Sequence, residues 1–237
     1  MSDTIRIACI GDSVVYGWGI SAYREELVWT AVLERLLNGE DESQAEEGHD
    51  EGHHAPEPVP QDRRYEVRNF GMPGQSVLPG FFTPEGQIDT GLYAQMLEWK
   101  PDAVFLHIGI NDTHRDYWDQ ERFAAGYRRL AEELTVLVGR RHVCLMECTY
   151  PLTEEGRVRM SLAGLDSDKV VRFINPFIAQ TAGELGTDLI DINAVFLSIP
   201  ELEGRAQELY ADEAHPNEAG NELIADAAYA IALGWEF

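Results

Sequence analysis

The chain alternates between short apolar segments and segments with helical spacing, and this alternation limits the folds open to it. Residues 5–10 form an almost continuous apolar, β-branched run, which is typical of a strand buried on both faces of a parallel sheet. The helix expected over residues 25–37 carries apolar residues three and four positions apart, and Asn38-Gly39 ends it. Strands that alternate with helices predict a parallel sheet covered by helices on both faces.

The same alternation continues to the end of the chain. Four further strands are predicted, over residues 65–70, 102–108, 142–148 and 188–192. Helices are predicted over residues 88–99, 119–138 and 168–185, with an irregular connection over 151–166 and a last helix capped by Asn217. The fold class is therefore α/β, a flavodoxin-like three-layer sandwich with a five-stranded parallel sheet. With 237 residues, of which 44% are apolar, the chain suits a single domain over residues 1–237, although length alone also allows two small ones.

Charge and composition exclude several classes of partner. The formal net charge is -24, so nucleic acid and anionic membrane surfaces would be repelled. No stretch approaches the ~20 consecutive apolar residues of a membrane span. Residues 1–6 lack the basic and apolar regions of a secretory signal, so we expect a cytoplasmic protein. The three cysteines predict buried reduced thiols and no disulfide framework.

One segment departs from the pattern. Residues 40–62 are rich in Glu, Asp, Gly, Pro and His and almost lack bulky apolar residues, which predicts an acidic, mobile surface insertion. His49, His53 and His54 lie among its acids, but their spacing matches no rigid metal site, and a solvated loop is the favoured interpretation. We therefore expect neither a metal nor a cofactor.

Polar residues follow the predicted strands at the points where those strands end. Ser13 follows the first strand, Gly74 the second and Asn111 the third, while Asp212 and His215 follow the fifth and precede the last helix. The carboxyl ends of parallel strands meet at one edge of a sheet, where open α/β sheets bind their ligands. We expect these residues, delivered by four separate loops, to meet in one crevice. Each motif taken alone is weak, since it also suits a turn, a helix cap or a surface pair.

These residue types are the parts of a nucleophilic hydrolase. A serine hydroxyl is a poor nucleophile until a base takes its proton, and His215 is the candidate base for Ser13. Asp212 can accept the other imidazole N–H and fix the tautomer. Attack on an ester creates an oxyanion, which the backbone N–H groups of Ser13 and Gly74 and the side-chain amide of Asn111 are placed to bind.

The same segments resemble the conserved blocks of the SGNH (GDSL) hydrolase family of esterases and lipases. The matching blocks are Gly11-Asp12-Ser13, residues 69–74, Gly109-Ile110-Asn111-Asp112 and Asp212-Glu213-Ala214-His215-Pro216. The resemblance implies the same fold, with Ser13 as nucleophile, His215 as base, Asp212 as its orienting partner, and Ser13, Gly74 and Asn111 as oxyanion hole. The chain departs from the family's usual pattern at Pro73 and in the length of the acidic insertion.

Within this family the chain is most similar to branches that act as carbohydrate O-acetyl esterases. The similar stretches are residues 65–71 and Asn111-Asp112 followed by Trp118. No broad apolar, lid-like segment is present in the sequence, which weighs against a long-chain lipase. The resemblance therefore implies a small-molecule ester as substrate, with an acetylated sugar as the leading candidate.

Aromatic residues lie near the predicted mouth of the site. Tyr16, Trp18, Tyr117 and Trp118 could stack on a sugar, and His114 could line the pocket. Packing in the core or at the rim is the alternative for all of them, because aromatic side chains bury large areas wherever they lie.

Three other functions remain open. A general short-chain esterase, thioesterase or lysophospholipase would use the same residues on a different acyl group. A non-catalytic binding module on the same fold would have no need of Ser13, Asp212 and His215 together. A nucleotide or flavin binder would need a phosphate-binding glycine loop, which the sequence lacks.

Overall fold

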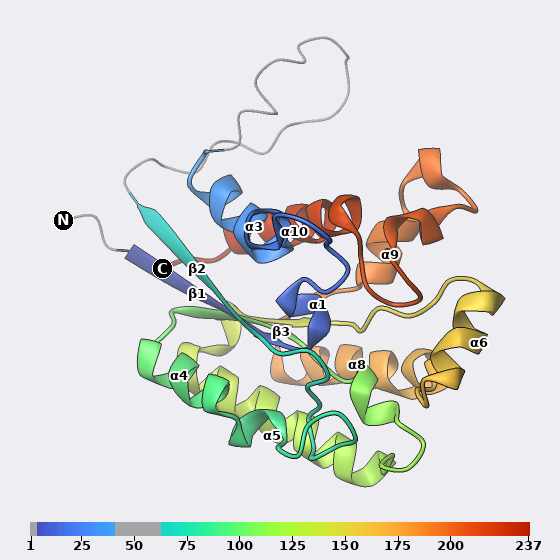
Figure 1. Ribbon diagram of the computed structural model, residues 1–237. Helices are drawn as coiled ribbons and strands as arrows, with labels where there is room; N and C mark the ends of the chain where they lie inside the picture. The colour runs from blue at the N-terminus through green and yellow to red at the C-terminus, as the bar shows by residue number, and fades with distance from the viewer. Residues whose placement is uncertain (1–3, 41–62) are drawn as a thin grey trace.

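A five-stranded parallel sheet forms the centre of the protein, in the order β2-β1-β3-β4-β5. The computed structural model describes residues 4–40 and 63–237. The strands are β1 Thr4–Gly11, β2 Arg64–Gly71, β3 Ala103–His107, β4 Val143–Met146 and β5 Asp188–Ile190. Every pairing in the sheet is parallel. Helices cover both faces, as Figure 1 shows, so the predicted fold class is confirmed.

One face of the sheet packs against the first and last helices of the chain. The helices of this layer are α1 Ser13–Tyr16, α2 Arg24–Leu27, α3 Trp29–Leu37, α9 Ile192–Leu197 and α10 Glu218–Leu233. Ile7 and Cys9 of β1 lie in the same core cluster as Trp29 of α3 and Ile224 of α10. Successive strand residues point to opposite faces, so this cluster takes every second residue of β1.

The other face packs against helices from the middle of the chain. This layer holds α4 Gly91–Trp99, α5 Gln120–Val138 and α8 Asn175–Leu185, drawn below the sheet in Figure 1. Ala8 and Ile10 of β1 join Phe123 of α5 and Ile178 of α8 in this second core cluster. Both faces of β1 are therefore buried, which explains its almost continuous apolar sequence.

Short helices complete the connections. They are the 3-10 segments Gln87–Asp89, Ile110–Thr113, Arg140–His142, Pro200–Leu202 and Ala206–Leu209, together with α6 Glu154–Leu162, α7 Ser167–Lys169 and the π-helical segment Val170–Ile174. The irregular connection predicted over 151–166 is therefore wrong, because it contains α6, which Thr153 caps by accepting from Gly156 N. Asn217 caps α10 as predicted, by accepting from Gly220 N.

The helix predicted over residues 25–37 is broken in two. Val28 is extended, with φ -65° and ψ 140°, and separates α2 from α3. Trp29 N donates to the side-chain oxygen of Asn221 on α10 at 3.0 Å, so α3 starts from a cap supplied by a distant residue. Hydrophobic spacing does not record such a partner, which is why the sequence alone predicts one helix.

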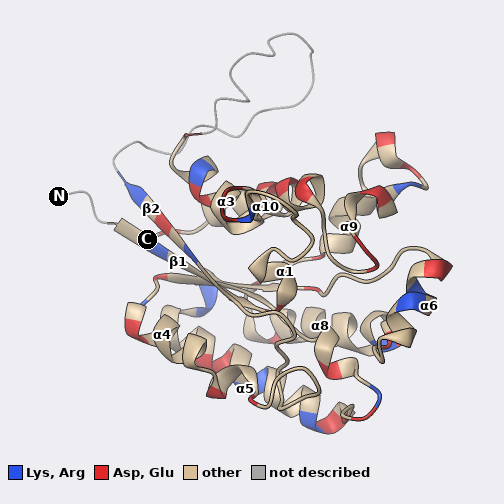
Figure 2. Ribbon diagram, in the orientation of Figure 1, with Lys and Arg blue, Asp and Glu red and all other residues tan. Residues whose placement is uncertain are grey.

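The predicted insertion over residues 40–62 lies outside the described residues except for Glu40. Among the helices that the structure describes, none has the length and apolar character needed to cross a membrane. Acidic residues lie along helices of both layers, as Figure 2 shows. Cys9, Cys144 and Cys148 are buried free thiols, as predicted, and burial raises the pKa of each.

Candidate active site

The first strand ends in a tight turn that places Ser13 at the carboxyl edge of the sheet. Gly11 has φ +146°, and a Cβ there would lie 1.8 Å from the backbone oxygen of His107, so only glycine fits. Asp12 then caps α1 by accepting from Val14 N at 3.0 Å. Ser13 is the first residue of α1, so its own N–H has no acceptor inside the helix.

The structure brings Ser13, His215 and Asp212 together in one hydrogen-bonded chain. Nε2 of His215 lies 2.8 Å from Oγ of Ser13, although 202 residues separate them in sequence. Nδ1 of the same ring lies 2.7 Å from Oδ2 of Asp212. A carboxylate accepts, so Nδ1 carries the donated proton and Nε2 is free to accept from the serine hydroxyl.

The turn that carries this pair is held from several sides. Oδ1 of Asp212 accepts from the backbone N–H groups of Ala214 and His215, each at 2.9 Å. Thr149, which follows β4, donates to Ala214 O at 2.7 Å. Burial raises the pKa of Asp212, but the hydrogen bonds from His215 and the backbone outweigh it, and the net pKa lies below its ordinary value. The carboxylate is therefore charged at neutral pH and its position is fixed.

Gly74 lies in a turn that explains both its own identity and that of Pro73. Gln75 N donates to Met72 O at 3.0 Å and closes a β-turn with Pro73 and Gly74 at its centre. Gly74 has φ +79°, the value expected at the third position of a type II turn, where proline suits the second position. The turn hydrogen bond does not use the N–H of Gly74, which leaves it available to a ligand.

Asn111 and Asp112 tie the loop after β3 to the loop after β2. Nδ2 of Asn111 donates to Gln75 O at 2.8 Å, which uses one of its two amide hydrogens. Asp112 accepts from Val77 N at 2.9 Å and from Leu78 N at 3.1 Å. These bonds bring the two predicted oxyanion-hole loops together. Burial raises the pKa of Asp112 to about 7, against the opposing effect of its backbone hydrogen bonds.

A second His–Asp pair lies at the turn that carries Ser13. Nδ1 of His107 is 3.1 Å from Oδ1 of Asp12, and both side chains are fully buried. The same Asp12 oxygen accepts from Val14 N, so this pair contacts the backbone of the turn that carries Ser13. The sequence alone did not identify His107 as a partner of this turn, because His107 lies at the end of an apolar strand and belongs to no recognisable motif.

The aromatic residues proposed for substrate binding have different surroundings. Half of the Trp18 side chain is exposed, and its ring centre lies 6.2 Å from that of His215. The guanidinium of Arg24 covers the ring of Tyr16 at 4.1 Å. Trp118 packs on Phe123 of the second core cluster, with ring centres 5.7 Å apart. Only Trp18 of these three therefore lies against the His215 ring with an exposed face.

His114 is buried, and its partners include two aromatic residues that the sequence analysis missed. Phe81 stacks on it, and Phe82 and Tyr117 contact it edge-on. Phe81 and Phe82 belong to the long loop after β2, between Pro79-Gly80 and residues 84–86. Two adjacent aromatic residues in a loop otherwise rich in glycine and proline are the signal that could have found them.

The arrangement as a whole can carry out nucleophilic attack on a carbonyl group. Ser13 is hydrogen-bonded to His215 and His215 to Asp212. On the neighbouring loops, the turn bond leaves the N–H of Gly74 available, and the bond to Gln75 uses only one amide hydrogen of Asn111. Residues 4–40 and 63–237 contain no group of three or more His, Cys, Asp or Glu side chains that could hold a metal ion. The histidines at 49, 53 and 54 lie outside these ranges.

Comparison with known proteins finds a family model that matches most of the chain. Residues 9–223 match the model of the GDSL-like Lipase/Acylhydrolase family. An acetylxylan esterase of Xylanibacter ruminicola is 23% identical over 242 aligned positions, which cover 94% of this chain and 42% of that protein. The chain thus spans about two fifths of the length of this curated relative.

Solved structures with the same fold cover nearly the whole chain. Axe2, an acetylxylan esterase from Geobacillus stearothermophilus, superposes with a TM-score of 0.66 at 21% identity, over 100% of this chain and 98% of that one. The lipase/acylhydrolase from Enterococcus faecalis gives a TM-score of 0.64 at 21% identity, over 97% and 96% of the two chains. At this level of identity the similarity shows a shared fold.

Proposed function

The chain belongs to the GDSL-like lipase/acylhydrolase family, and from this premise we propose that it is a serine esterase that removes short acyl groups from esters. The leading candidate substrate is an acetylated carbohydrate. The single observation that carries the proposal is the hydrogen-bonded chain from Ser13 Oγ through the imidazole of His215 to Asp212. A serine hydroxyl with a base and an orienting carboxylate is the arrangement that activates this nucleophile.

In the first half of the proposed reaction, Ser13 Oγ attacks the ester carbonyl carbon while Nε2 of His215 takes the hydroxyl proton. The negative charge on the carbonyl oxygen is stabilised by the N–H groups of Ser13 and Gly74 and by the second amide hydrogen of Asn111. The imidazolium then donates its proton to the departing alkoxide. The products of this half are a free alcohol and an acyl group on Ser13.

In the second half, water replaces the alcohol. His215 Nε2 takes a proton from the water as its oxygen attacks the acyl carbon, and the same donors stabilise the second oxyanion. Proton transfer from His215 to Ser13 Oγ then releases the acid and restores the free enzyme. Asp212 stays charged throughout and stabilises the imidazolium in both halves.

The preference for acetyl esters of sugars rests on relatives and on the site's surroundings. The proteins from Xylanibacter ruminicola and Geobacillus stearothermophilus are both acetylxylan esterases. Trp18 offers an exposed ring beside His215, on which a sugar could pack. A general short-chain esterase or thioesterase would use the same three residues, so the acyl group must be tested separately.

The test compares release of p-nitrophenol from the acetyl and octanoyl esters by the wild type, Ser13→Ala and Ser198→Ala. Ser198 is an exposed serine after α9 and serves as the matched control. We expect rapid acetyl ester hydrolysis that Ser13→Ala abolishes and Ser198→Ala retains. Strong octanoyl hydrolysis would contradict the short-chain preference. Equal activity in Ser13→Ala would contradict the serine mechanism.

A further inference from the structure

Four side chains, three of them exposed and one buried, form an aromatic cluster beside the candidate site, here called the aromatic platform. Its members are Phe81, Phe82, His114 and Tyr117. Phe81 lies flat on His114, with ring centres 4.1 Å apart and an angle of 5° between the planes. Clustered exposed aromatic side chains mark binding surfaces, because a soluble protein otherwise gains by covering them.

The ring of Phe81 is fixed with one face free. His114 covers one face, and the rings of Phe82 and Tyr117 stand at steep angles to that of Phe81, with ring centres 5.1 and 6.2 Å away. Because 55% of Phe81 is nevertheless exposed, the face opposite His114 is open to solvent. His114 is itself held, since a Cβ on Gly164 would lie only 2.6 Å from its Nε2. Phe81 therefore offers one flat, open face, and the His114 ring that supports it has little room to move.

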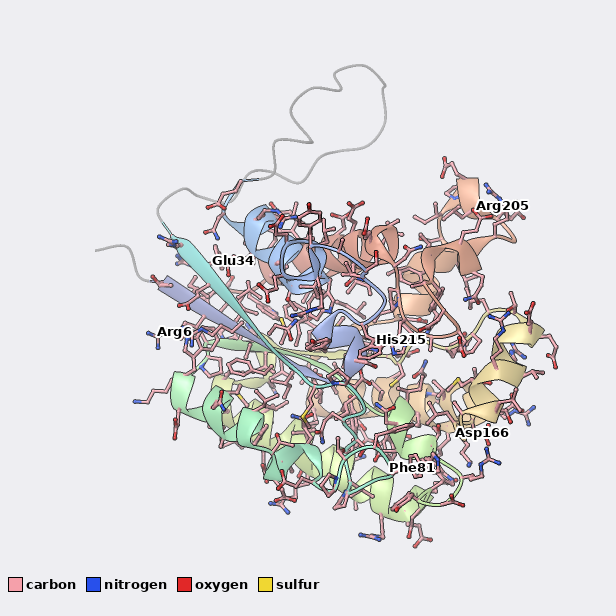
Figure 3. The ribbon with its side chains drawn as sticks, in the orientation of Figure 1. Arg6, Glu34, Phe81, Asp166, Arg205 and His215 are labelled. Atoms are coloured by element: carbon pink, nitrogen blue, oxygen red, sulfur yellow. The ribbon has the colours of Figure 1, made fainter. Side chains whose placement is uncertain are left out.

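The platform adjoins both oxyanion-hole loops. A Cβ on Gly74 would lie 2.6 Å from the Cβ of Phe82, so Phe82 is in direct contact with the Gly74 turn. On the other loop, His114 N donates to Asn111 O at 3.4 Å. Phe81 and His215 lie on the same side of the molecule, beyond the carboxyl ends of the strands, as Figure 3 shows. A molecule bound at Ser13 and extending past Gly74 would reach the platform.

We propose that the aromatic platform binds a pyranose ring of the sugar that carries the ester, by packing against the open face of Phe81. The proposal rests on the proposed esterase function and adds a substrate subsite to it. A pyranose has a C–H face that packs on an aromatic ring and hydroxyl groups around its edge that remain in water. The open face of Phe81 matches the C–H face of a pyranose, and the polar residues Arg115 and Asp116 lie in the same loop as His114.

An acyl chain fits this surface less well. Burial of a flexible hydrocarbon is favourable in proportion to the area removed from water, so a surface open on one side stabilises a long chain only weakly. Phe81 offers one open face, and the neighbouring Tyr117 is also half-exposed. A one-sided surface therefore favours a rigid ring over a long chain.

The test uses Phe81→Ala, Phe81→Leu and Phe81→Tyr, with Tyr23→Ala as the matched control. Tyr23 is an exposed aromatic residue, 74% accessible, that belongs to none of the ring contacts of the platform. Acetate release is measured from acetylated xylotetraose and from ethyl acetate, whose leaving group is too small to reach the platform. The quantity compared is the ratio of kcat/KM for the oligosaccharide to that for ethyl acetate.

We expect this ratio to fall about tenfold in Phe81→Ala, the loss of one ring-stacking contact, with most of the change in KM for the oligosaccharide. Phe81→Leu should behave like Phe81→Ala because it lacks a flat face. Phe81→Tyr and Tyr23→Ala should stay within twofold of the wild type. An unchanged ratio in Phe81→Ala, or full retention in Phe81→Leu, would overturn the proposal.

The outcomes for the two proposals are separable. If the wild type releases no acetate from ethyl acetate, or releases it at the same rate as Ser13→Ala, the proposed esterase function itself is wrong. If Ser13-dependent hydrolysis of ethyl acetate is present but acetylated xylotetraose is not a better substrate, the platform does not bind its sugar and this inference alone is wrong.

Discussion

One His–Asp pair contacts Ser13 and a second contacts the turn that carries it, and the surroundings of the two pairs differ. In the His215–Asp212 pair, 24% and 35% of the side chains are exposed, and the imidazole reaches Ser13 Oγ. In the His107–Asp12 pair both side chains are 0% exposed, and the carboxylate is bonded to the backbone at Val14. Under the proposed function, the first pair is the proton acceptor with its partner, and the second pair supports the turn from inside the protein.

The two pairs therefore differ in the group that each contacts besides its own partner. This group is the Ser13 hydroxyl for His215–Asp212 and the backbone N–H of Val14 for His107–Asp12. A base must reach both the nucleophile and the substrate, so part of it must face the open site. A buried pair does neither, but it can fix the strand-to-helix turn on which the nucleophile lies. The comparison predicts that variants of the first pair lose turnover, whereas variants of the second lose stability.

The largest effect is expected from His215→Ala. Removal of the base leaves Ser13 without a proton acceptor, so kcat should fall by about 10⁵ to 10⁶. The melting temperature should stay close to that of the wild type, because the side chain is partly exposed. Steady-state hydrolysis of p-nitrophenyl acetate and a thermal melt measure both quantities. A loss of less than a hundredfold would mean that another group serves as base.

Asp212→Asn should have the next largest effect. The amide no longer stabilises the imidazolium and can favour the wrong tautomer, so kcat should fall by about 10⁴. The matched control is Asp191→Asn, an aspartate that also accepts a backbone N–H, in this case as the cap of α9. Equal losses in the two variants would show that Asp212 acts only through the turn that it holds.

His107→Ala should act mainly on folding. It removes the partner of a buried carboxylate and leaves a cavity, so the free energy of unfolding should fall by roughly 3–5 kcal/mol. The folded fraction should keep kcat within tenfold of the wild type, measured well below the melting temperature. If His107→Ala instead lost as much turnover as His215→Ala at unchanged stability, the two pairs would have to exchange roles.

The smallest effect is expected from Asp112, a buried carboxyl group close to Asp12, on the pH dependence of the free energy of unfolding. Burial, together with the nearby Asp12, raises the pKa of Asp112 to about 7. Between about pH 4 and pH 7 the folded protein therefore holds a proton that the unfolded chain has released, so stability falls as the pH rises through this window. Asp112→Asn should make this decline shallower in urea unfolding at several pH values.

Two other acids set the background for that measurement. Glu147, half-buried near Asp191, has a pKa raised to about 7 by burial, and it contributes a decline of the same sign in both proteins. Asp212 has a lowered pKa, so its contribution is present at neutral pH and is lost only as the pH falls. An identical slope in wild type and Asp112→Asn would contradict the raised pKa of Asp112.

Much of the fold follows from sequence patterns that depend on local spacing. The runs that form β1 and β3 are apolar because both faces of the sheet are covered, and Asn217 marks the start of α10 by its capping chemistry. The break at Val28 could not be predicted in this way, because the cap of α3 comes from Asn221 at the other end of the chain. Such a partner becomes visible only when the helices have packed.

In the candidate site, too, some features can be predicted from the sequence and others cannot. Ser13, Gly74 and Asn111 come within a few residues of strand ends, so the topology alone predicts that they meet. The Asp212–His215 turn is separated from β5 by α9 and two 3-10 segments, so its position depends on how these connections pack. The His107–Asp12 pair at the turn before Ser13 depends on the register of β1 and β3, which pairs Gly11 with His107. Local sequence does not reveal this register. The aromatic platform depends on how a long loop folds over α5, for which the sequence offers only its composition.

Covalent labelling of Ser13 by a fluorophosphonate, followed by peptide mass spectrometry, tests directly whether His215 activates the Ser13 hydroxyl. Such probes react with serines whose hydroxyl proton is taken by a base. We expect one label per chain, on the peptide that contains Ser13. The labelling rate should fall at least about a hundredfold in His215→Ala and stay within tenfold of the wild type in His107→Ala. Labelling at another serine, or an undiminished rate in His215→Ala, would contradict the activation of Ser13 by His215.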